Sequence, residues 1–77
     1  MKNEILKVIA NSLNIDLKKL TDEMGPGDIP EWDSLGHQNL IMALENKYKI
    51  KLDIDEVLEM ETVEEIIDIL QAKVKTL

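Results

Sequence analysis

The sequence lacks cysteine, phenylalanine and arginine, and its 77 residues include one tryptophan and one tyrosine. Without cysteine the chain forms no disulfide, and any thiol chemistry needs sulfur from outside the protein. No apolar run approaches the roughly 18 residues of a membrane span, and no signal-peptide core is visible. The sequence therefore predicts a cytoplasmic protein that does not insert into membranes.

Positive charge is also scarce, and the formal net charge is −7. Eight acids and no base lie between Asp53 and Asp68, whereas Lys47, Lys49 and Lys51 form one local basic cluster. A surface with this balance repels nucleic acid and anionic membranes and attracts basic protein partners. For any single acid, the alternative explanation is the ordinary need of a small protein for solvated charge.

Glycine and proline are few and cluster together, and they predict a long loop over residues 21–32. Before this loop, apolar residues at helical spacing predict a helix over about residues 3–14. After it, a second helix is predicted from Asp33 or Ser34 to about Lys49. The apolar residues expected on its buried face are Leu40, Ile41, Leu44 and Tyr48.

The region after the second helix predicts an extended connector and then a short turn of helix over residues 55–59. The connector alternates polar and apolar residues, but no second run of this kind exists to pair with it as a strand. In the short turn, Val57, Leu58 and Met60 are expected to face inward.

A T-x-x-E motif formed by Thr62 and Glu65 predicts a capping box that begins the last helix, which runs to about Lys73. The predicted fold class is all-α, a small bundle of three main helices plus one short helix, with the long loop between the first and second helices. Residues 1–77 are expected to form a single domain.

The candidate functional stretch is E-W-D-S-L-G-H, residues 31–37. Trp32 is expected to anchor the loop to the core. Ser34 either only caps the helix or stands exposed for covalent modification, where free amides and the helix dipole favour an attached phosphate. His37 is expected to be an exposed surface group that contacts a partner, because the sequence offers no acid or oxyanion loop for a Ser–His hydrolase. No metal site is predicted, since Asp53 and its neighbours lack calcium-loop spacing.

The stretch D-S-L-G-H-Q-N-L-I-M-A-L-E, residues 33–45, resembles the modification site of the acyl carrier protein family, and the similarity covers nearly the whole chain. The resemblance implies that Ser34 receives 4′-phosphopantetheine from coenzyme A through a separate phosphopantetheinyl transferase. The thiol of this arm then carries an acyl or aminoacyl group as a thioester between loading and transfer enzymes. It also implies a monomer that is not an enzyme but a substrate for several. The competing hypothesis is a noncovalent acidic interaction module in which Ser34 is only a cap.

The same resemblance implies that transferase and partner enzymes recognise residues around Ser34 along the second helix. Departures from the family pattern are the neutral residues Gly36, Gln38 and Asn39 where other members are acidic, and the lysines that follow Glu45. These departures indicate a specialised carrier, for example of polyketide, peptide, D-alanyl or surface-glycan synthesis, rather than one of housekeeping fatty acid synthesis. The implied recognition residues are Asp33, Leu35, His37, Leu40 and Glu45.

Overall fold

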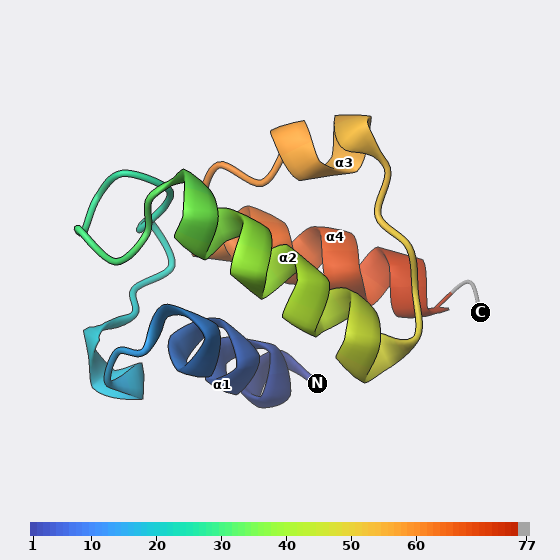
Figure 1. Ribbon diagram of the computed structural model, residues 1–77. Coiled ribbons are helices and arrows are strands. Elements are labelled where there is room, and N and C mark those ends of the chain that lie inside the picture. The colour runs from blue at the N-terminus through green and yellow to red at the C-terminus, as the bar shows by residue number, and fades with distance from the viewer. Residues whose placement is uncertain (76–77) are drawn as a thin grey trace.

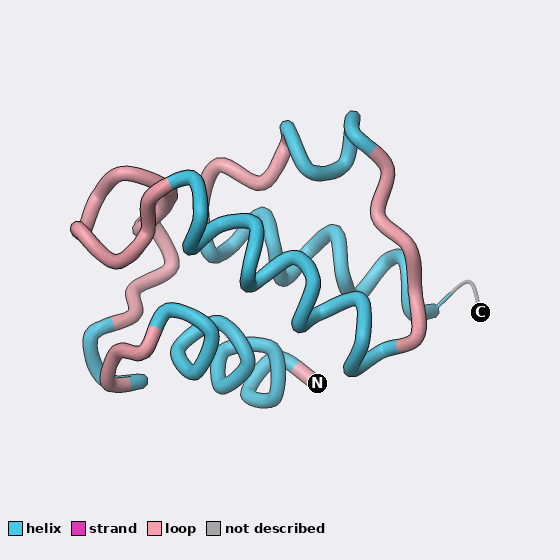
Figure 2. Tube along the Cα trace, in the orientation of Figure 1, coloured by secondary structure: helices cyan, strands magenta, loops and turns pink. Residues whose placement is uncertain are grey.

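The computed structural model describes residues 1–75, which form four α-helices and one short 3-10 helix and contain no strand. This arrangement confirms the predicted all-α class with three long helices and one short one (Figure 2). The elements in chain order are α1 (Lys2–Leu13), η1 (Leu17–Lys19), α2 (Ser34–Tyr48), α3 (Ile54–Leu58) and α4 (Val63–Lys75).

The three long helices surround one apolar core. In Figure 1, α2 crosses the front of the molecule with α4 behind it, α1 lies below, and α3 lies above. Helix α1 packs against both α2 and α4. Of the stripe predicted for α2, Leu40, Ile41 and Leu44 are buried in the core, whereas Tyr48 is only partly buried. The core side chains without exposed surface are Ile5, Ile9, Trp32, Leu40, Leu44, Val63, Ile66 and Leu70.

The short helix α3 begins one residue earlier than expected, and one of the residues expected to face inward is exposed. Asp53 caps it by accepting a hydrogen bond from the Glu56 amide at 2.8 Å, and the Glu56 carboxylate accepts one from the Asp53 amide at 3.0 Å. The expectation that Leu58 faces inward is wrong, because Leu58 is 70% exposed and Ile54 is 77% exposed. Met60 is buried as predicted, and Val57 is partly buried. The D-x-x-E capping box, which the sequence analysis missed, fixes the residue at which this helix begins.

The long loop also holds the beginning of α4. Thr62 Oγ1 accepts a hydrogen bond from the Glu65 amide at 3.2 Å, as the capping motif predicts. The other half of the box differs, because the Thr62 hydroxyl donates to the Glu65 carboxylate instead of the carboxylate accepting from the Thr62 amide. The first two amides of α4 donate to loop carbonyls: Val63 to Met24 at 2.8 Å and Glu64 to Asp22 at 3.0 Å. These bonds satisfy helix-end amides that have no partner inside the helix.

Internal hydrogen bonds order the loop just before α2. The Gly25 amide donates to the Asp28 carboxylate at 2.8 Å, and the Gly27 amide donates to the Trp32 carbonyl at 2.7 Å. The Trp32 side chain has no exposed surface and belongs to the core. Trp32 is therefore the loop-to-core anchor that the sequence predicts, and it fixes the position at which α2 begins.

Candidate functional site

The first turn of α2 shows which residue caps the helix. Asp33 is the N-cap, and its carboxylate accepts a hydrogen bond from the Gly36 amide at 2.8 Å. Ser34 is the first helical residue, so the hypothesis that Ser34 serves only as the cap is wrong. Its side chain is exposed, and its hydroxyl has no hydrogen-bond partner within residues 1–75. The Asp33 cap thus leaves the Ser34 hydroxyl available for chemistry.

Gly36 is buried, because the head of α2 lies close against the preceding loop and α1. A Cβ atom at Gly36 would overlap the Glu31 carbonyl oxygen and approach the Leu13 side chain to 3.1 Å. The expectation that Gly36 offers a neutral group on the exposed face of the helix is therefore wrong. An acidic residue at this position would not fit, so its absence follows from packing.

An open hollow of about 450 Å³ lies beside Ser34. The Ser34 and Leu35 amides are at the positive end of the α2 dipole, and neither has an acceptor in the described part of the chain. An exposed hydroxyl, free amides and adjacent open space can accommodate a phosphate ester on Ser34 Oγ. The hollow is lined by Pro26, Gly27, Trp32, Asp33, Ser34 and His37.

His37 differs from the exposed group that the sequence predicts. Its ring is partly buried, and its Nδ1 atom accepts a hydrogen bond from Trp32 Nε1 at 3.0 Å. The two rings are stacked with centroids 6.2 Å apart and planes 23° apart. Burial lowers the pKa of His37 below its ordinary value, although the nearby Val57 carbonyl acts in the opposite direction. The ring is therefore neutral at neutral pH, with its proton on Nε2 because Nδ1 is the acceptor.

This environment predicts a loss of stability in mild acid. Since the pKa of His37 is lower in the folded chain than its ordinary value of 6.5, the unfolded chain binds the proton more readily. Neutral His37 therefore makes its full contribution to the free energy of unfolding above pH 6.5. This contribution decreases as the pH falls below 6.5 towards the pKa of His37 in the folded chain. The Lys73 side chain, followed by the Asp53 amide, lowers the pKa of Glu56, so that carboxylate loses its contribution only below its ordinary value of 4.5.

Thermal unfolding of the unloaded protein between pH 4.5 and 6.5 therefore measures the loss of stability that protonation of His37 causes. His37 is the chain's single histidine. His37→Gln offers the Trp32 indole an acceptor but does not titrate, so this variant should lose less stability across the same interval. Identical pH dependence in the two proteins would contradict the assignment to His37.

The other predicted recognition residues have different environments. Leu35 follows Ser34 and is 65% exposed, so it is accessible to a partner. Leu40 has no exposed surface, and the expectation that a partner reads it is wrong because it packs in the core. Glu45 is partly buried and accepts a hydrogen bond from the Leu52 amide at 2.9 Å, which ties α2 to the connector. Sequence reasoning missed Met42, which is 49% exposed, although its seven-residue spacing from Leu35 places both on one side of the helix.

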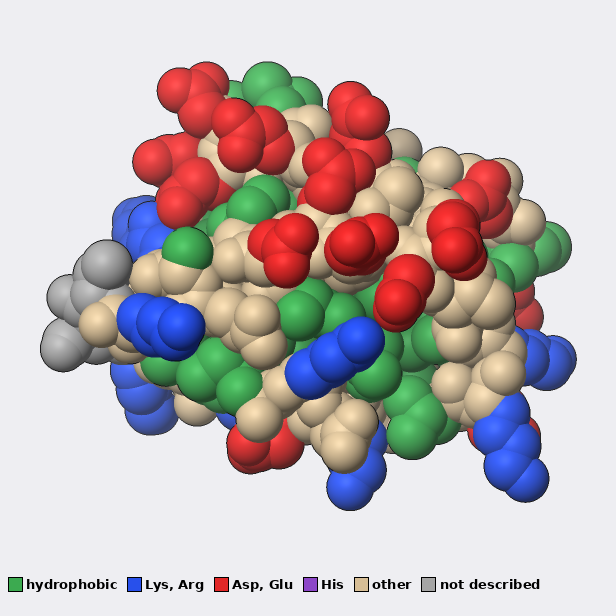
Figure 3. Space-filling model, turned by 180° about the vertical axis from the view of Figure 1, so that it is seen from behind, with side chains coloured by type: hydrophobic (Ala, Val, Ile, Leu, Met, Phe, Trp, Pro, Cys, Tyr) green, Lys and Arg blue, Asp and Glu red, His purple; other side chains and the backbone are tan. Residues whose placement is uncertain are grey.

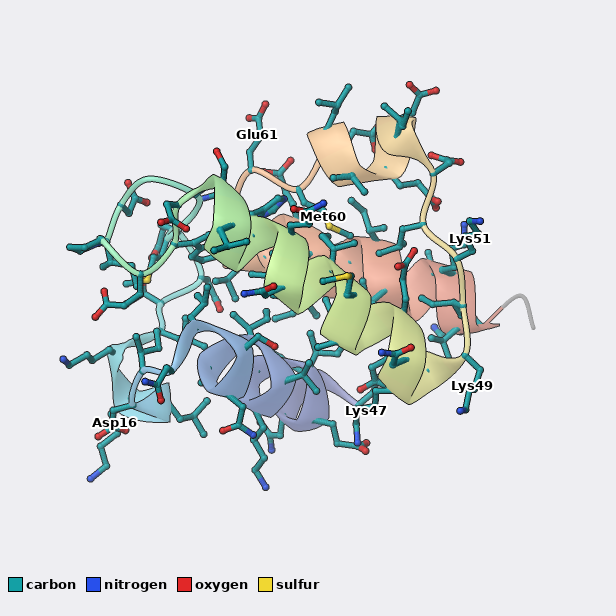
Figure 4. All side chains as sticks on the ribbon, viewed as in Figure 1. Asp16, Lys47, Lys49, Lys51, Met60 and Glu61 are labelled. Atoms are coloured by element: carbon teal, nitrogen blue, oxygen red, sulfur yellow. The ribbon has the colours of Figure 1, made fainter. Side chains whose placement is uncertain are left out.

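The charges divide the surface into distinct regions. Figure 3 shows carboxylates gathered along the upper half of the rear face, whereas most lysines lie lower. Figure 4 shows Lys47, Lys49 and Lys51 at the end of α2 that is distant from the long loop. Lys47 Nζ lies 3.9 Å from the Glu4 carboxylate of α1, so part of this basic cluster is locally paired. The exposed face of α2 carries no acid, and its residues are Leu35, Gln38, Asn39, Met42 and Asn46.

No helix among residues 1–75 is both long enough and apolar enough to cross a bilayer. No group of three or more histidine, aspartate or glutamate side chains in the same residues is arranged to hold a metal ion.

Comparison with known proteins gives consistent relatives over almost the full chain, although no protein-family profile matches it. The acyl carrier protein of Thermosynechococcus vestitus is 30% identical over 77 residues, covering 95% of each chain. That of Syntrophobacter fumaroxidans is 33% identical over 70 residues, covering 91% of this chain and 86% of the relative. The solution structure of holo acyl carrier protein from Geobacter metallireducens superposes with a TM-score of 0.86 at 32% identity, covering 97% of this chain and 86% of that one.

Proposed function

The chain belongs to the acyl carrier protein family, and we propose that it holds acyl or aminoacyl intermediates as thioesters on a 4′-phosphopantetheine arm attached to Ser34. The observation that carries this proposal is the exposed, unbonded Ser34 hydroxyl at the first position of α2, directly after a separate capping residue. A carrier role also accounts for the absence of cysteine, because the arm supplies the thiol that forms the thioester.

The residues around Ser34 fit a phosphodiester at this position. Ser34 Oγ gives up its proton to a base of the transferase and bonds to the phosphorus of the pantetheine phosphate of coenzyme A, while the P–O bond of the diphosphate breaks and adenosine 3′,5′-bisphosphate leaves. The unpartnered amides of Ser34 and Leu35 and the helix dipole stabilise the negative charge that stays on the protein. Asp33 fixes the first turn through its bond to the Gly36 amide and so holds the hydroxyl in position. A separate phosphopantetheinyl transferase provides the catalysis.

A mass measurement tests the proposal. The purified chain, incubated with coenzyme A, magnesium and a broad-specificity phosphopantetheinyl transferase, should gain the mass of one phosphopantetheine. A carrier known to accept the arm, treated in parallel, is the control for transferase activity. If this control is loaded and the chain stays unmodified, the noncovalent interaction module replaces the carrier as the better hypothesis.

The exposed face of α2 supports a further proposal about partner enzymes. Brief encounters between a carrier and its enzymes rely on electrostatic steering, and a basic docking patch needs acids on the carrier. Here the face beside Ser34 presents Leu35, Gln38, Asn39 and Met42, with lysines beyond them. Enzymes that dock through apolar and neutral contacts match this face better than enzymes with basic patches. We infer that the chain serves a dedicated pathway rather than housekeeping fatty acid synthesis.

This inference predicts poor elongation by fatty acid synthase enzymes with basic docking patches. Gln38 and Asn39 are exposed, so replacing both with glutamate adds negative charge without disturbing the core. The double substitution should increase kcat/KM for elongation, because the added carboxylates attract the basic patch of the enzyme. An added attraction of roughly 1.4 kcal/mol corresponds to an increase of about tenfold. The comparison uses the loaded wild type, the loaded variant and the host's fatty acid carrier. Equal elongation of the two unmutated carriers would contradict the inference.

A further inference from the structure

His37 lies one helical turn after Ser34, and both residues line the same hollow. Side chains three positions apart on a helix are neighbours, with Cβ atoms about 5–6 Å apart. His37 also lines a second hollow, which reaches Met60 and Glu61, the two residues that Figure 4 labels below and beside α3. The ring therefore borders both the hollow at the modification site and the hollow beside α3.

The surroundings of Ser34 contain few groups that can balance an added anion. The charged side chains lining the two hollows are the carboxylates of Asp33, at the start of α2, and Glu61, in the segment before α4. Neither hollow is lined by a lysine. His37 is the one lining side chain that can become positively charged, and both carboxylates favour that form.

In the unloaded protein, the His37 ring accepts a hydrogen bond from the Trp32 indole that only the neutral ring can accept. The Trp32 Nε1–H group donates to His37 Nδ1, so Nδ1 carries no proton. A protonated ring has a donor at both nitrogens and cannot accept this bond. Protonation of His37 and the Trp32–His37 hydrogen bond therefore exclude each other.

We propose that His37 is a positioning residue for the phosphodiester of the loaded arm: attachment of the anion to Ser34 favours the imidazolium, which gives up the Trp32 bond and pairs with the phosphate. This inference rests on the proposed attachment at Ser34. The ring takes its proton from solvent, and no other bond changes. Loading therefore removes the hydrogen bond that the Trp32 indole donates in the unloaded protein. Trp32 is the residue that anchors the long loop in the core.

Nuclear magnetic resonance provides the test, because the chain has one histidine and a phosphodiester has no proton of its own to lose near neutral pH. The His37 ring resonances are titrated in the unloaded and loaded proteins, whose masses are verified first. Loading should raise the His37 pKa by about 1 or more, the effect of an opposite charge within 4–6 Å. The phosphorus resonance should move with the same midpoint, and Trp32 fluorescence should change with it.

Two variants separate positioning from a structural role. In loaded His37→Gln, the phosphorus resonance should not move between about pH 5 and 8, because the introduced amide does not titrate. In loaded His37→Lys, a permanent cation should keep the phosphorus resonance near the position that the wild type reaches in acid. An unchanged His37 pKa on loading, or a phosphorus titration that persists in His37→Gln, overturns the inference while the mass still supports the carrier function. Absence of the mass gain overturns both.

Discussion

Replacing Ser34 with alanine is expected to abolish covalent loading completely while leaving the melting temperature almost unchanged. The hydroxyl is the nucleophile that the transferase needs, and the helix does not depend on it because Asp33 is the cap. An exposed side chain without a hydrogen-bond partner contributes within about 0.5 kcal/mol to the free energy of unfolding. Mass spectrometry after treatment with coenzyme A and transferase measures loading, and thermal unfolding measures stability.

Two control substitutions sharpen this experiment. Thr21→Ala removes an exposed hydroxyl from the loop that precedes α2 and should leave loading intact. Asp33→Ala removes the cap and should lower the free energy of unfolding by about 0.5–2 kcal/mol. A mass gain on Ser34→Ala would place the attachment on another residue, and a large fall in its melting temperature would contradict the assignment of the cap to Asp33.

The fold class was predictable because local patterns decide it. Apolar residues at helical spacing gave three helices with bounds within about two residues of those observed, and the clustered glycines and prolines marked the loop. For α3 the short helix itself was predicted, but the inward orientation of Leu58 was wrong, because five residues make too few turns for periodicity to show which side is buried. A further signal there was the D-x-x-E motif of Asp53 and Glu56, which marks the start of the helix and which the sequence analysis missed.

The candidate site was predictable in its position but not in its contacts. The D-S-L motif located the modification point, and the loop before it made Ser34 accessible. The contacts of His37 come from two other elements: the Trp32 indole from the loop and the Val57 carbonyl from α3. These contacts depend on the tertiary fold. Burial of Leu40 was also implied by its place in the predicted apolar stripe, so its assignment as a partner contact was inconsistent with the predicted fold. A residue cannot fill the core and also present its side chain to an enzyme.

Contacts between the loop and α4 were beyond sequence reasoning, because they join segments almost forty positions apart. Gly25 is the residue on which this contact depends. It is buried, and a Cβ atom there would overlap the Glu61 carbonyl oxygen and lie 2.9 Å from the Glu61 carbonyl carbon. These are backbone atoms, which cannot move aside as a flexible side chain can. Alanine at this position therefore forces the loop away from the start of α4.

Gly25→Ala is accordingly expected to destabilise the protein by about 3 kcal/mol, because it adds overpacking to strain on the bonds from Val63 and Glu64 to the loop. For a domain of this size the melting temperature should fall by roughly 12–24 °C. Gly27→Ala is the matched control: no atom lies within 4 Å of its Cβ position, but its φ is +91°. Backbone strain alone should cost that variant about 1–2 kcal/mol. Equal losses in the two variants would show that the close approach to Glu61 contributes nothing, and that the loop does not support α4 through this contact.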